Sequence, residues 1–434
     1  MKRTFLTGLA VVVLAAAGGA LYVNGSTSAD NVADDSATGA DTTTLDAQAV
    51  ARGAYVAVQG DCAACHTAPG GKAYAGGYGL QTPFGVIYST NITPERKTGI
   101  GTWTEREFFR AVRHGRRQDG QLLYPAMPYN AYVKMSDDDL HDLWAYMRSL
   151  TPVAQAPTPN TLGFPYNIRL AMAGWNLLFF DNSPYRPDPG QSGEWNRGRY
   201  LVEGAGHCAA CHTPKNALGG DTGAYLQGAE LLGGHAPEIT GNAYRGLGGW
   251  SEAQIRDYLK LGSNHKAVAS GAMAEAVEHS TQHLRDDDLK AIAVYLKSLP
   301  GSGQVAPPPV AADSPAMRRG AQVYEANCMA CHNVHGEGIP GMVTAFADNP
   351  QIRTSTGSNL ISAVLKGGRA VVTNGNVTGA GMPSFDWKLT DSDIAAVLTY
   401  VRNSWGNAAP GVGTDAVAKA RASLGASANL SRSE

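Results

Sequence analysis

The sequence predicts an all-α protein with three tandem domains, and two observations lead to that prediction. A Cys-x-x-Cys-His string with a helix-like segment before it occurs three times along the 434 residues. Each repeat also ends on a segment whose apolar residues recur at i, i+3, i+4 and i+7, the pattern of a helix with one buried face. Since such an internal repeat means that one structural unit is copied along the chain, we expect three similar helical domains.

Two helices are expected in each repeat from the segments that open and close it. The opening segments are ARGAYVAVQGDCAACH, NRGRYLVEGAGHCAACH and RRGAQVYEANCMACH. The closing segments are SDDDLHDLWAYMRSL, RDDDLKAIAVYLKSL and TDSDIAAVLTYVRNS, and Tyr146, Tyr295 and Tyr400 occupy the same offset within them. Their acidic N-terminal ends complement the helix dipole, and Ser136 and Thr390 are expected N-caps.

A middle helix is expected in the first two repeats. Thr104 with Glu107, and Ser251 with Gln254, have the spacing of a capping box. The third repeat has only the looser counterpart SNLISAVLKGG, and the best strand signal is the short segment FGVIYSTNI at 84–92.

Composition and clusters of Pro and Gly indicate where the chain divides into domains and linkers. Pro and Gly gather at 300–313, whereas 151–190 contains NIRLAMAGWNLLFF, which is too apolar to be left in water. The predicted segments are a signal peptide or N-terminal membrane anchor (1–25), a flexible acidic tether (26–46), a first domain (47–150), a structured linker (151–190), a second domain (191–300), a Pro-rich linker (301–314), a third domain (315–407) and a C-terminal tail (408–434).

The N-terminus indicates export. Lys2 and Arg3 precede the uncharged apolar run 4–23, and Ala15 to Ala17 offer a small-residue cleavage site. A helix of about 20 residues is also long enough to span a bilayer, so cleaved signal and retained anchor both remain open. Either way we expect the bulk of the chain outside the cytoplasm. The formal net charge of -2 gives no basic footprint for nucleic acid.

The repeated Cys-x-x-Cys-His motif is the attachment signature of c-type haem. Cysteines at i and i+3 share one face of a helical turn, so both thiols reach the porphyrin edge. The expected thioether cysteines are Cys62, Cys65, Cys208, Cys211, Cys328 and Cys331, which are all the cysteines of the chain. Zinc would need paired Cys-x-x-Cys elements, and a thioredoxin-like motif would need a βαβ context. We therefore expect three covalently bound haem c groups.

The iron ligands are expected to be one histidine and one methionine in each repeat. His66, His212 and His332 follow the second cysteine of each motif and are the proximal ligands. Electron-transferring haem c commonly takes Met as its second axial ligand. Met127, Met273 and Met382 precede the closing helices by similar gaps and are the expected second ligands.

The remaining methionine, histidine and arginine candidates are expected to have roles other than iron ligation. Met135 and Met147 are expected in the core, and Met342 follows His332 too closely. His114 could in principle replace Met127, but it has no counterpart in the other two repeats. His207 and His335 lie beside the motifs and are expected to have surface or loop roles. The basic run Arg113, Arg116 and Arg117 is expected to be a solvated face, with contact to haem propionates or a partner as the alternative.

Longer stretches of the sequence resemble one family. They are YAGGYGLQTPFGVIYSTNITP (74–94), GIGTWT (99–104), LYPAMPYNAY (123–132), NRGRYLVEGAGHCAACHTP (196–214) and MAEAVEHSTQHL (273–284). Over about residues 47 to 407 the chain is similar to the triheme cytochrome c subunit of bacterial membrane-bound dehydrogenases of the alcohol, gluconate, fructose and sorbitol type. The resemblance implies three tandem class I cytochrome c domains and the six iron ligands named above.

The resemblance also implies a role. Such subunits pass electrons from a separate catalytic flavin- or quinone-dependent dehydrogenase subunit to ubiquinone or onward, on the periplasmic side of the cytoplasmic membrane. The chain departs from some members after Trp405, where it has no apolar run for membrane association. The alternatives are a free periplasmic carrier and a cytochrome subunit serving a terminal oxidase. A haem peroxidase would need an open iron site, so we expect no catalysis by this chain alone.

Overall fold

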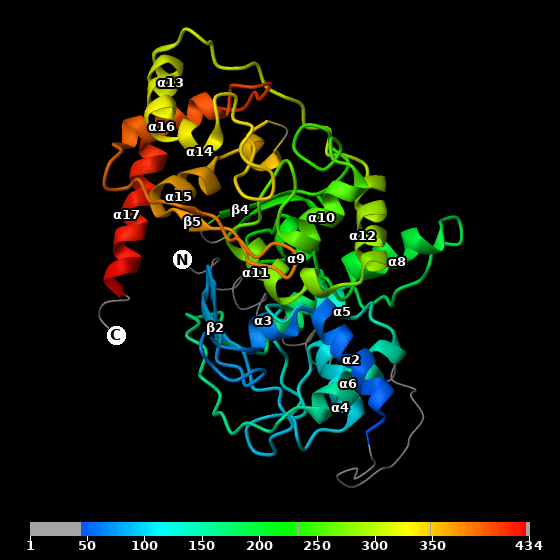
Figure 1. Cartoon of the computed structure of the whole chain (residues 1–434). Helices are drawn as coiled ribbons and strands as arrows, with labels where there is room; N and C mark the ends of the chain where they lie inside the picture. Colours follow the sequence, from blue (N-terminus) through cyan, green and yellow to red (C-terminus); the bar gives the residue numbers. More distant parts are fainter. Residues whose placement is uncertain (1–44, 232–233, 348, 431–434) are drawn as a thin grey trace, which may run out of the picture. The chain divides into compact units, whose positions relative to one another are not determined.

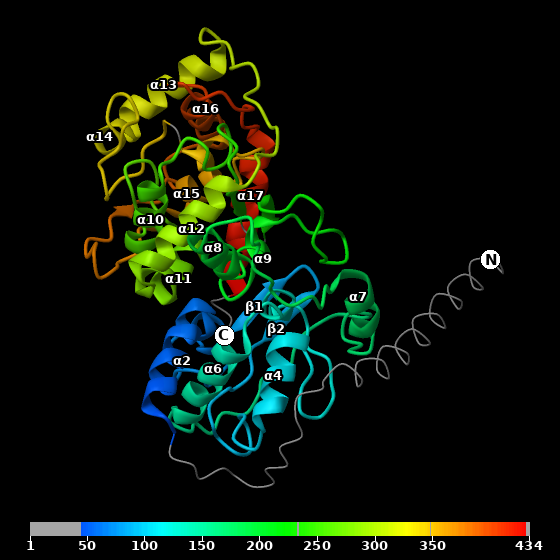
Figure 2. The same ribbon diagram turned by 90° about the vertical axis from the view of Figure 1, so that its right-hand side faces the viewer.

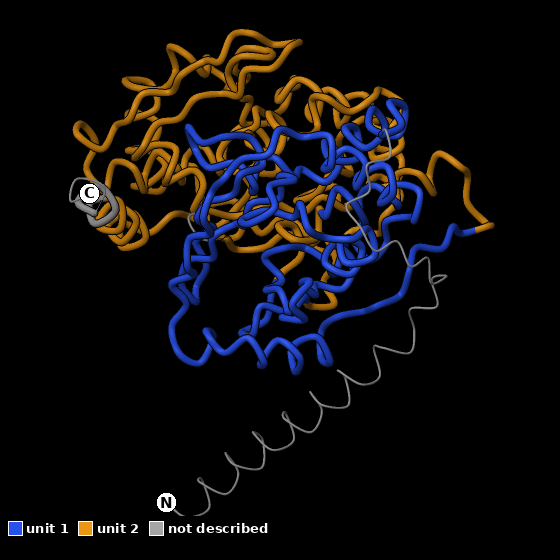
Figure 3. Tube along the Cα trace, turned by 90° about the horizontal axis from the view of Figure 1, so that it is seen from below, with its two compact units in different colours: residues 1–188, 200–207, 215–221 blue, residues 189–199, 208–214, 222–434 orange. Residues whose placement is uncertain are grey.

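The computed structural model describes residues 45–231, 234–347 and 349–430. The expected signal or anchor, and nearly all of the expected tether, lie outside these ranges. No helix within them is long and apolar enough to cross a membrane. The described chain is mostly helical and divides into two compact units, shown in two colours in Figure 3.

Unit 1 runs to Asp188 and also takes in 200–207 and 215–221. Its elements are α2 (Ala47–Gln59), α3 (Cys62–His66), β1 (Gly79–Thr82), β2 (Gly85–Tyr88), α4 (Glu105–His114), α5 (Tyr129–Tyr132), α6 (Asp137–Ser149) and α7 (Ala171–Phe179). Helices α2 and α4 both pack on α6, as Figure 2 shows. The core of the first repeat forms where they meet, around Val56, Phe108, Leu140 and Leu143.

Unit 2 holds the third repeat and most of the second. Its elements from the second repeat are α8 (Gly193–Glu203, of which 200–203 count with unit 1), α9 (Ala209–His212), β3 (Gln227–Leu231), β4 (Gly234–Glu238), α10 (Glu252–Leu261), α11 (Ala272–His279), η1 (Thr281–His283) and α12 (Asp286–Ser298). Those of the third are α13 (Pro315–Asn327), α14 (Met329–His332), η2 (Pro350–Arg353), α15 (Ser358–Lys366), β5 (Gly368–Arg369), β6 (Gly381–Met382), α16 (Asp391–Val401) and α17 (Thr414–Leu430).

The opening and closing helices of each repeat cross at a glycine. A Cβ built on Gly53 would lie 1.8 Å from the carbonyl oxygen of Asp142, one on Gly198 would lie 1.9 Å from that of Ala291, and one on Gly320 would lie 2.3 Å from that of Ala396. The Cβ atoms of the three repeated tyrosines, Tyr146, Tyr295 and Tyr400, lie beside the same glycines. The repeated tyrosine therefore marks the helix crossing, where only a residue without a side chain fits.

Local capping explains where the helices begin. The side chains of Ser136 and Thr390 accept bonds from the third residue of α6 and α16, as expected. Thr104 and Ser251 form complete capping boxes with Glu107 and Gln254 at the starts of α4 and α10. The third repeat begins its middle helix, α15, after Gly357 in the left-handed region instead.

Three hairpins refine the expectation of an all-α fold. The expected strand at 84–92 is shorter, since only Gly85–Tyr88 pairs, with β1. The pairs β3–β4 and β5–β6 were not expected from the sequence. The hairpins β1–β2 and β3–β4 lie after the motifs of the first and second repeats, and each leads the chain back toward the motif helix.

Two segments outside the repeats are ordered against them. The segment 151–190 contains α7 and also runs along β2, where Thr161 and Gly163 donate backbone bonds to the carbonyls of Val86 and Phe84. The C-terminal tail forms α17, which packs on α15 and α16 with Val417 fully buried (Figure 1). A structured linker was expected from the sequence, whereas the secondary structure of the tail was not predicted.

Candidate functional site

Each Cys-x-x-Cys-His string forms a single helical turn directly after its opening helix. These turns are α3, α9 and α14. The first cysteine of each motif is half-buried and the second is exposed, and none of the six forms a disulfide. Two thiols on one face of a turn, with one side open to solvent, suit covalent attachment of a large planar group.

The histidine of each motif is held through its Nδ1 atom by a backbone carbonyl. The distances are 2.7 Å from His66 to Thr90, 2.7 Å from His212 to Pro237 and 3.3 Å from His332 to Thr344. A carbonyl only accepts, so Nδ1 carries the proton and Nε2 keeps its lone pair for a metal. Burial lowers the pKa of all three imidazoles, which favours the neutral, ligating form.

The thiols are not tuned for redox exchange. Burial raises the pKa of Cys62 and Cys208 to about 12, and that of Cys328 to about 11. A thioredoxin-like cysteine has a lowered pKa, so these motifs do not match that chemistry. Among the residues that the structure describes, no three His, Cys, Asp or Glu side chains are grouped so that they could hold a metal ion.

The apolar surroundings fit a haem in the first and third repeats. Cys62 and Met127 pack against one apolar cluster that includes Val56 and Phe108. In the third repeat, Cys328 and Met382 likewise pack against one cluster, that of Ile361 and Leu398. A thiol for covalent attachment, an apolar wall and a soft sulfur ligand together suit a haem c.

Met273 lies in a smaller cluster. It contacts the group formed by Ala269, Val277 and Val371, the last of which belongs to the third repeat. The rejected candidates Met135 and Met147 are 3% and 1% exposed and belong to the core of the first repeat, as expected.

The three methionines stand in different local structures. Met127 lies in a turn in which its N–H bonds the carbonyl of Tyr124. Met273 is the second residue of α11, after Gly271 with a φ of 55°. Met382 ends β6, opposite Gly368. A shared gap to the closing helix therefore does not mean a shared backbone conformation.

Three of the remaining histidines, His114, His207 and His335, have contacts outside the motifs. The ring of His114 lies edge-on to Phe180, and that of His207 lies edge-on to Tyr132. His335 is exposed in a loop, where its N–H bonds the carboxylate of Glu337. The exposed loop position of His335 matches the role expected from the sequence, whereas His114 and His207 contact aromatic rings.

The arginines of the basic run in the first repeat have different surroundings. Arg113 pairs with Asp137 at 2.6 Å and donates to the carbonyl of Met135, so it ties α4 to the start of α6. Arg117 instead lines a cavity of about 320 Å³ within unit 1. Only part of the run is therefore a solvated face.

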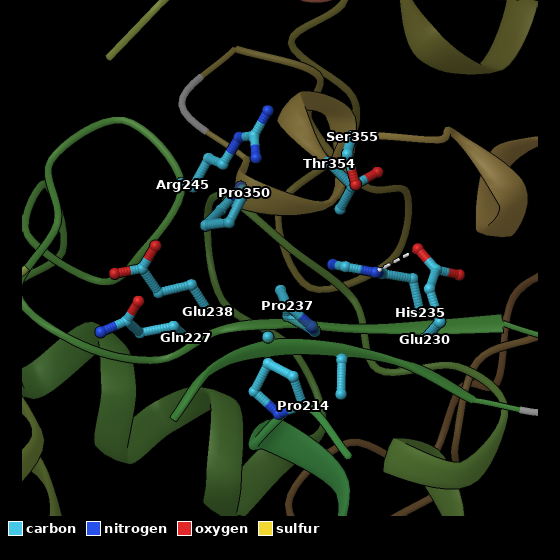
Figure 4. Close-up of a pocket in the computed structure, with 12 residues that line it drawn as sticks. Pro214, Gln227, Glu230, His235, Pro237, Glu238, Arg245, Pro350, Thr354 and Ser355 are labelled. Carbon is cyan, nitrogen blue, oxygen red and sulfur yellow. Dashed lines mark hydrogen bonds and ion pairs between the residues drawn. The ribbon is translucent and has the colours of Figure 1, made fainter. Parts of the chain in front are cut away.

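A second cavity, of about 250 Å³, lies within unit 2 between the β3–β4 hairpin and the segment of Pro350, Thr354 and Ser355 (Figure 4). Its wall includes Pro237, whose carbonyl holds His212. Both signs of charge line it: His235 pairs with Glu230 at 2.8 Å, and Arg245 and Glu238 lie nearby. Its lining therefore offers groups of both signs rather than one charged surface.

Comparison with known proteins agrees with this arrangement. A family model described as cytochrome c matches residues 50–151, 196–300 and 317–405. The chain belongs to the cytochrome c family. Cytochromes c carry covalently bound haem c, and each of the three matched segments contains one motif helix and one carbonyl-bound histidine.

Curated relatives among the cytochromes c match most of the chain. The gluconate 2-dehydrogenase cytochrome c subunit of Pantoea cypripedii is 42% identical over 382 residues, covering 83% of this chain and 86% of the relative. The fructose dehydrogenase cytochrome subunit of Gluconobacter japonicus is 40% identical, with coverage of 86% and 82%. The cytochrome c subunit of the quinone alcohol dehydrogenase of Gluconacetobacter polyoxogenes is 40% identical, with coverage of 87% and 85%. The resemblance noted in the sequence is confirmed.

Sequence reasoning missed the three residues that hold the cytochrome histidines. Thr90, Pro237 and Thr344 act through backbone carbonyls, so their side chains carry no signal for this role. The glycines of the helix crossings do have a sequence signal. Each follows an arginine at the same place in the three opening segments.

Proposed function

We propose that the chain contains three tandem class I cytochrome c domains, at 47–150, 191–300 and 315–407, each with one covalently bound haem c. The observation that carries this proposal is the threefold site: a motif turn followed by a histidine whose Nδ1 is held by a carbonyl. The three matched segments of the family model support the same count.

Within each proposed domain the chain supplies two iron ligands. The Nε2 atoms of His66, His212 and His332 would hold the iron, and the sulfurs of Met127, Met273 and Met382 would be its second ligands. When bound, a haem ligated by His and Met supplies a one-electron redox centre of raised potential. The apolar residues around each methionine exclude water and so limit the reorganisation that accompanies electron transfer.

The proposed role is an electron relay. We infer that the chain accepts electrons from a separate flavin- or quinone-dependent dehydrogenase subunit and passes them to ubiquinone or a downstream oxidase. The support comes from the relatives, three of which are named as cytochrome subunits of gluconate, fructose and alcohol dehydrogenases. The protein itself positions and tunes the redox centres, and no dehydrogenase chemistry is assigned to it.

The proposed location is the periplasmic side of the cytoplasmic membrane, with membrane association. Covalent haem attachment and the apolar run at 4–23 support export, although that run lies outside the described residues. Exposed apolar side chains in unit 1 support association: they are Phe164, Ile168, Leu170, Leu177 and Leu178. Arg169 is the only charged residue between 152 and 180.

Reconstitution tests the relay. The purified oxidised chain is expected to stay oxidised with ethanol, gluconate or fructose alone. It should become reduced when its co-purifying catalytic subunit is added with substrate, and should be reoxidised by a ubiquinone analogue. Reduction by substrate without the partner would contradict the relay. Reduction with the partner but without quinone reactivity would favour the free-carrier alternative.

A further inference from the structure

The cavity of unit 1 is walled partly by the repeat and partly by the linker that follows it. From the first repeat it is lined by Tyr88, Thr90, Arg117 and Tyr124, and from the linker by residues including Asn160 and Arg169. Its volume is about 320 Å³, enough for several ordered polar groups.

The linker is fastened to the repeat along this wall. Asn160 accepts a bond of 2.9 Å from the N–H of Tyr88, at the end of β2. On the other wall, the hydroxyl of Tyr124 donates to the carbonyl of Tyr166 at 2.9 Å. The linker therefore bridges the strand side and the methionine side of the repeat, and closes the cavity between them.

Two arginines face this space without a carboxylate among the lining residues. The guanidinium of Arg169 lies over the ring of Tyr124 at 4.7 Å and donates to the carbonyl of Leu122 at 2.8 Å. Arg117 has one acidic neighbour, Asp119, at a loose 3.8 Å. Burial, and to a lesser degree repulsion from Arg117, lowers the pKa of Arg169. Two partly buried cations that repel one another are stabilised by an anion between them.

The cavity also has a defined place beside the redox site. One wall contains Thr90, whose carbonyl holds His66, and the other contains Tyr124, whose carbonyl bonds the N–H of Met127. A group held between His66 and Met127 would therefore lie close to this space. In haem c the thioether edge is fixed at the cysteines, and the two propionate carboxylates lie on the opposite edge.

We propose that Arg117 and the linker residue Arg169 form a carboxylate-binding site that receives the propionates of the haem in the first repeat. The inference rests on the proposed haem of that repeat. Arg169 lies outside the segment 50–151 that matches the cytochrome c family model, so the first haem site is completed by a part of the chain beyond its own domain. Arg169 is thus a positioning and potential-setting residue.

The test is a redox titration of the full exported chain with Arg169→Gln, Arg169→Lys and Arg117→Gln. A cation beside the haem favours the reduced state, so each Gln variant should lower one of three midpoint potentials. We expect about a tenfold change in that one-electron equilibrium, about 59 mV. Arg169→Lys keeps the charge and should stay near the wild-type potential. The matched control is Arg96→Gln, an exposed arginine of the same repeat that does not line the cavity.

Intact mass distinguishes failure of the proposed haem content from failure of the propionate site. Fewer than three haem masses on the wild-type chain would contradict the proposed function itself. With three haems present, unchanged potentials in both Gln variants would overturn the propionate site alone. An equal shift in Arg169→Gln and Arg169→Lys would assign Arg169 to packing on Tyr124 and would also overturn it.

A diffusible anion is the competing source of the carboxylate. The wild-type chain is titrated with acetate and with inorganic phosphate at constant ionic strength while the potentials are followed. We expect no saturable change, because the propionates already fill the site. A saturable shift that disappears in Arg169→Gln would show an open anion site and contradict the assignment.

Discussion

At the scale of single residues, the chemistry depends on one hydrogen bond that occurs three times. The carbonyls of Thr90, Pro237 and Thr344 hold the Nδ1 protons of three histidines and leave each Nε2 free. Such a bond fixes both the tautomer and the ring orientation, and it raises the basicity of the ligating nitrogen. The longer bond of His332, at 3.3 Å, is accompanied by stacking of its ring on Phe346 at 4.4 Å.

The proposed methionine ligation is tested most sharply at Met273, which lies in the smallest apolar cluster of the three. Met273→Leu should remove about one third of the Met-to-iron charge-transfer absorption and lower one midpoint potential, because leucine preserves the volume but has no sulfur. The measurements are the absorption spectrum and a redox titration of the exported chain.

The control for this substitution is Met135→Leu, at a methionine buried in the core of the first repeat. It should leave both the absorption and all potentials unchanged. If Met273→Leu behaved like Met135→Leu, the second ligand of that haem would be another residue.

At the scale of elements, the opening and closing helices of each repeat are joined by an Arg–Asp ion pair, and the position of the aspartate differs in the first repeat. Arg197 pairs with Asp288 at 2.7 Å and Arg319 with Asp393 at 2.6 Å, the aspartate in both cases standing just before the first apolar anchor of the closing helix. In the first repeat Arg52 pairs with Asp142 instead, at 2.6 Å.

The corresponding aspartate of the first repeat has another partner. Asp139 accepts a 2.5 Å bond from the hydroxyl of Tyr200, which counts with unit 1, and burial raises the pKa of this phenol to about 12. The first repeat therefore uses the position to hold a residue from the start of the second.

The helix crossing predicts a large effect of a small substitution. Gly198→Ala places a Cβ 1.9 Å from the carbonyl oxygen of Ala291, so α8 and α12 must move apart. We expect a loss of about 1–3 kcal/mol or more in the free energy of unfolding, measured as a lower midpoint in a denaturant titration.

The matched control for the crossing is Gly193→Ala in the same helix, where an added Cβ meets no atom within 4 Å. It should change the free energy of unfolding by less than about 0.5 kcal/mol. Equal midpoints for the two alanine variants would mean that the close crossing is not a constraint in solution.

The elements that the sequence predicted are those with a helical period and a cap. Helices α6, α12 and α16 follow the expected apolar anchors, and Ser136 and Thr390 cap as expected. The hairpins were missed because strands of two to five residues are too short for an alternating pattern. The helix α17 was missed although Val417, Ala420 and Leu424 have helical spacing, because its apolar face is built mostly of small residues.

Some residues of the candidate sites could be predicted from the sequence, and others could not. The cysteines and histidines could be named from their spacing, because the motif is local in the chain. Arg169 could not be connected to the first repeat, because only the path of the linker along β2 brings it there.

At the scale of the whole molecule, the linker gives unit 1 an apolar surface. Leu177 and Leu178 of α7 are 64% and 67% exposed, and Phe164 is 82% exposed. Trp175 of the same helix is turned inward, where its Nε1 donates to the carbonyl of Leu218 at 3.0 Å. Contiguous exposed apolar patches mark contact with a partner or a membrane, and we propose that these side chains form one.

Membrane association by this surface is tested with Leu177→Ser and Leu178→Ser combined in the full exported chain. Because each buried leucine contributes up to about 1.5–3 kcal/mol, the double variant should co-float with phosphatidylcholine vesicles at least about tenfold more weakly. Val377→Ser, at a 76% exposed position of unit 2, is the control and should float like the wild type. Unchanged flotation of the double variant would contradict the assignment of this surface.

The measurement that tests the central claim most directly is the intact mass of the exported, purified chain. The proposal of three cytochrome c domains predicts the polypeptide mass plus three covalent haems, and Cys208→Ala combined with Cys211→Ala should remove one of them. A wild-type mass with two haems or fewer after complete maturation, or a double variant that still carries three, would contradict the account.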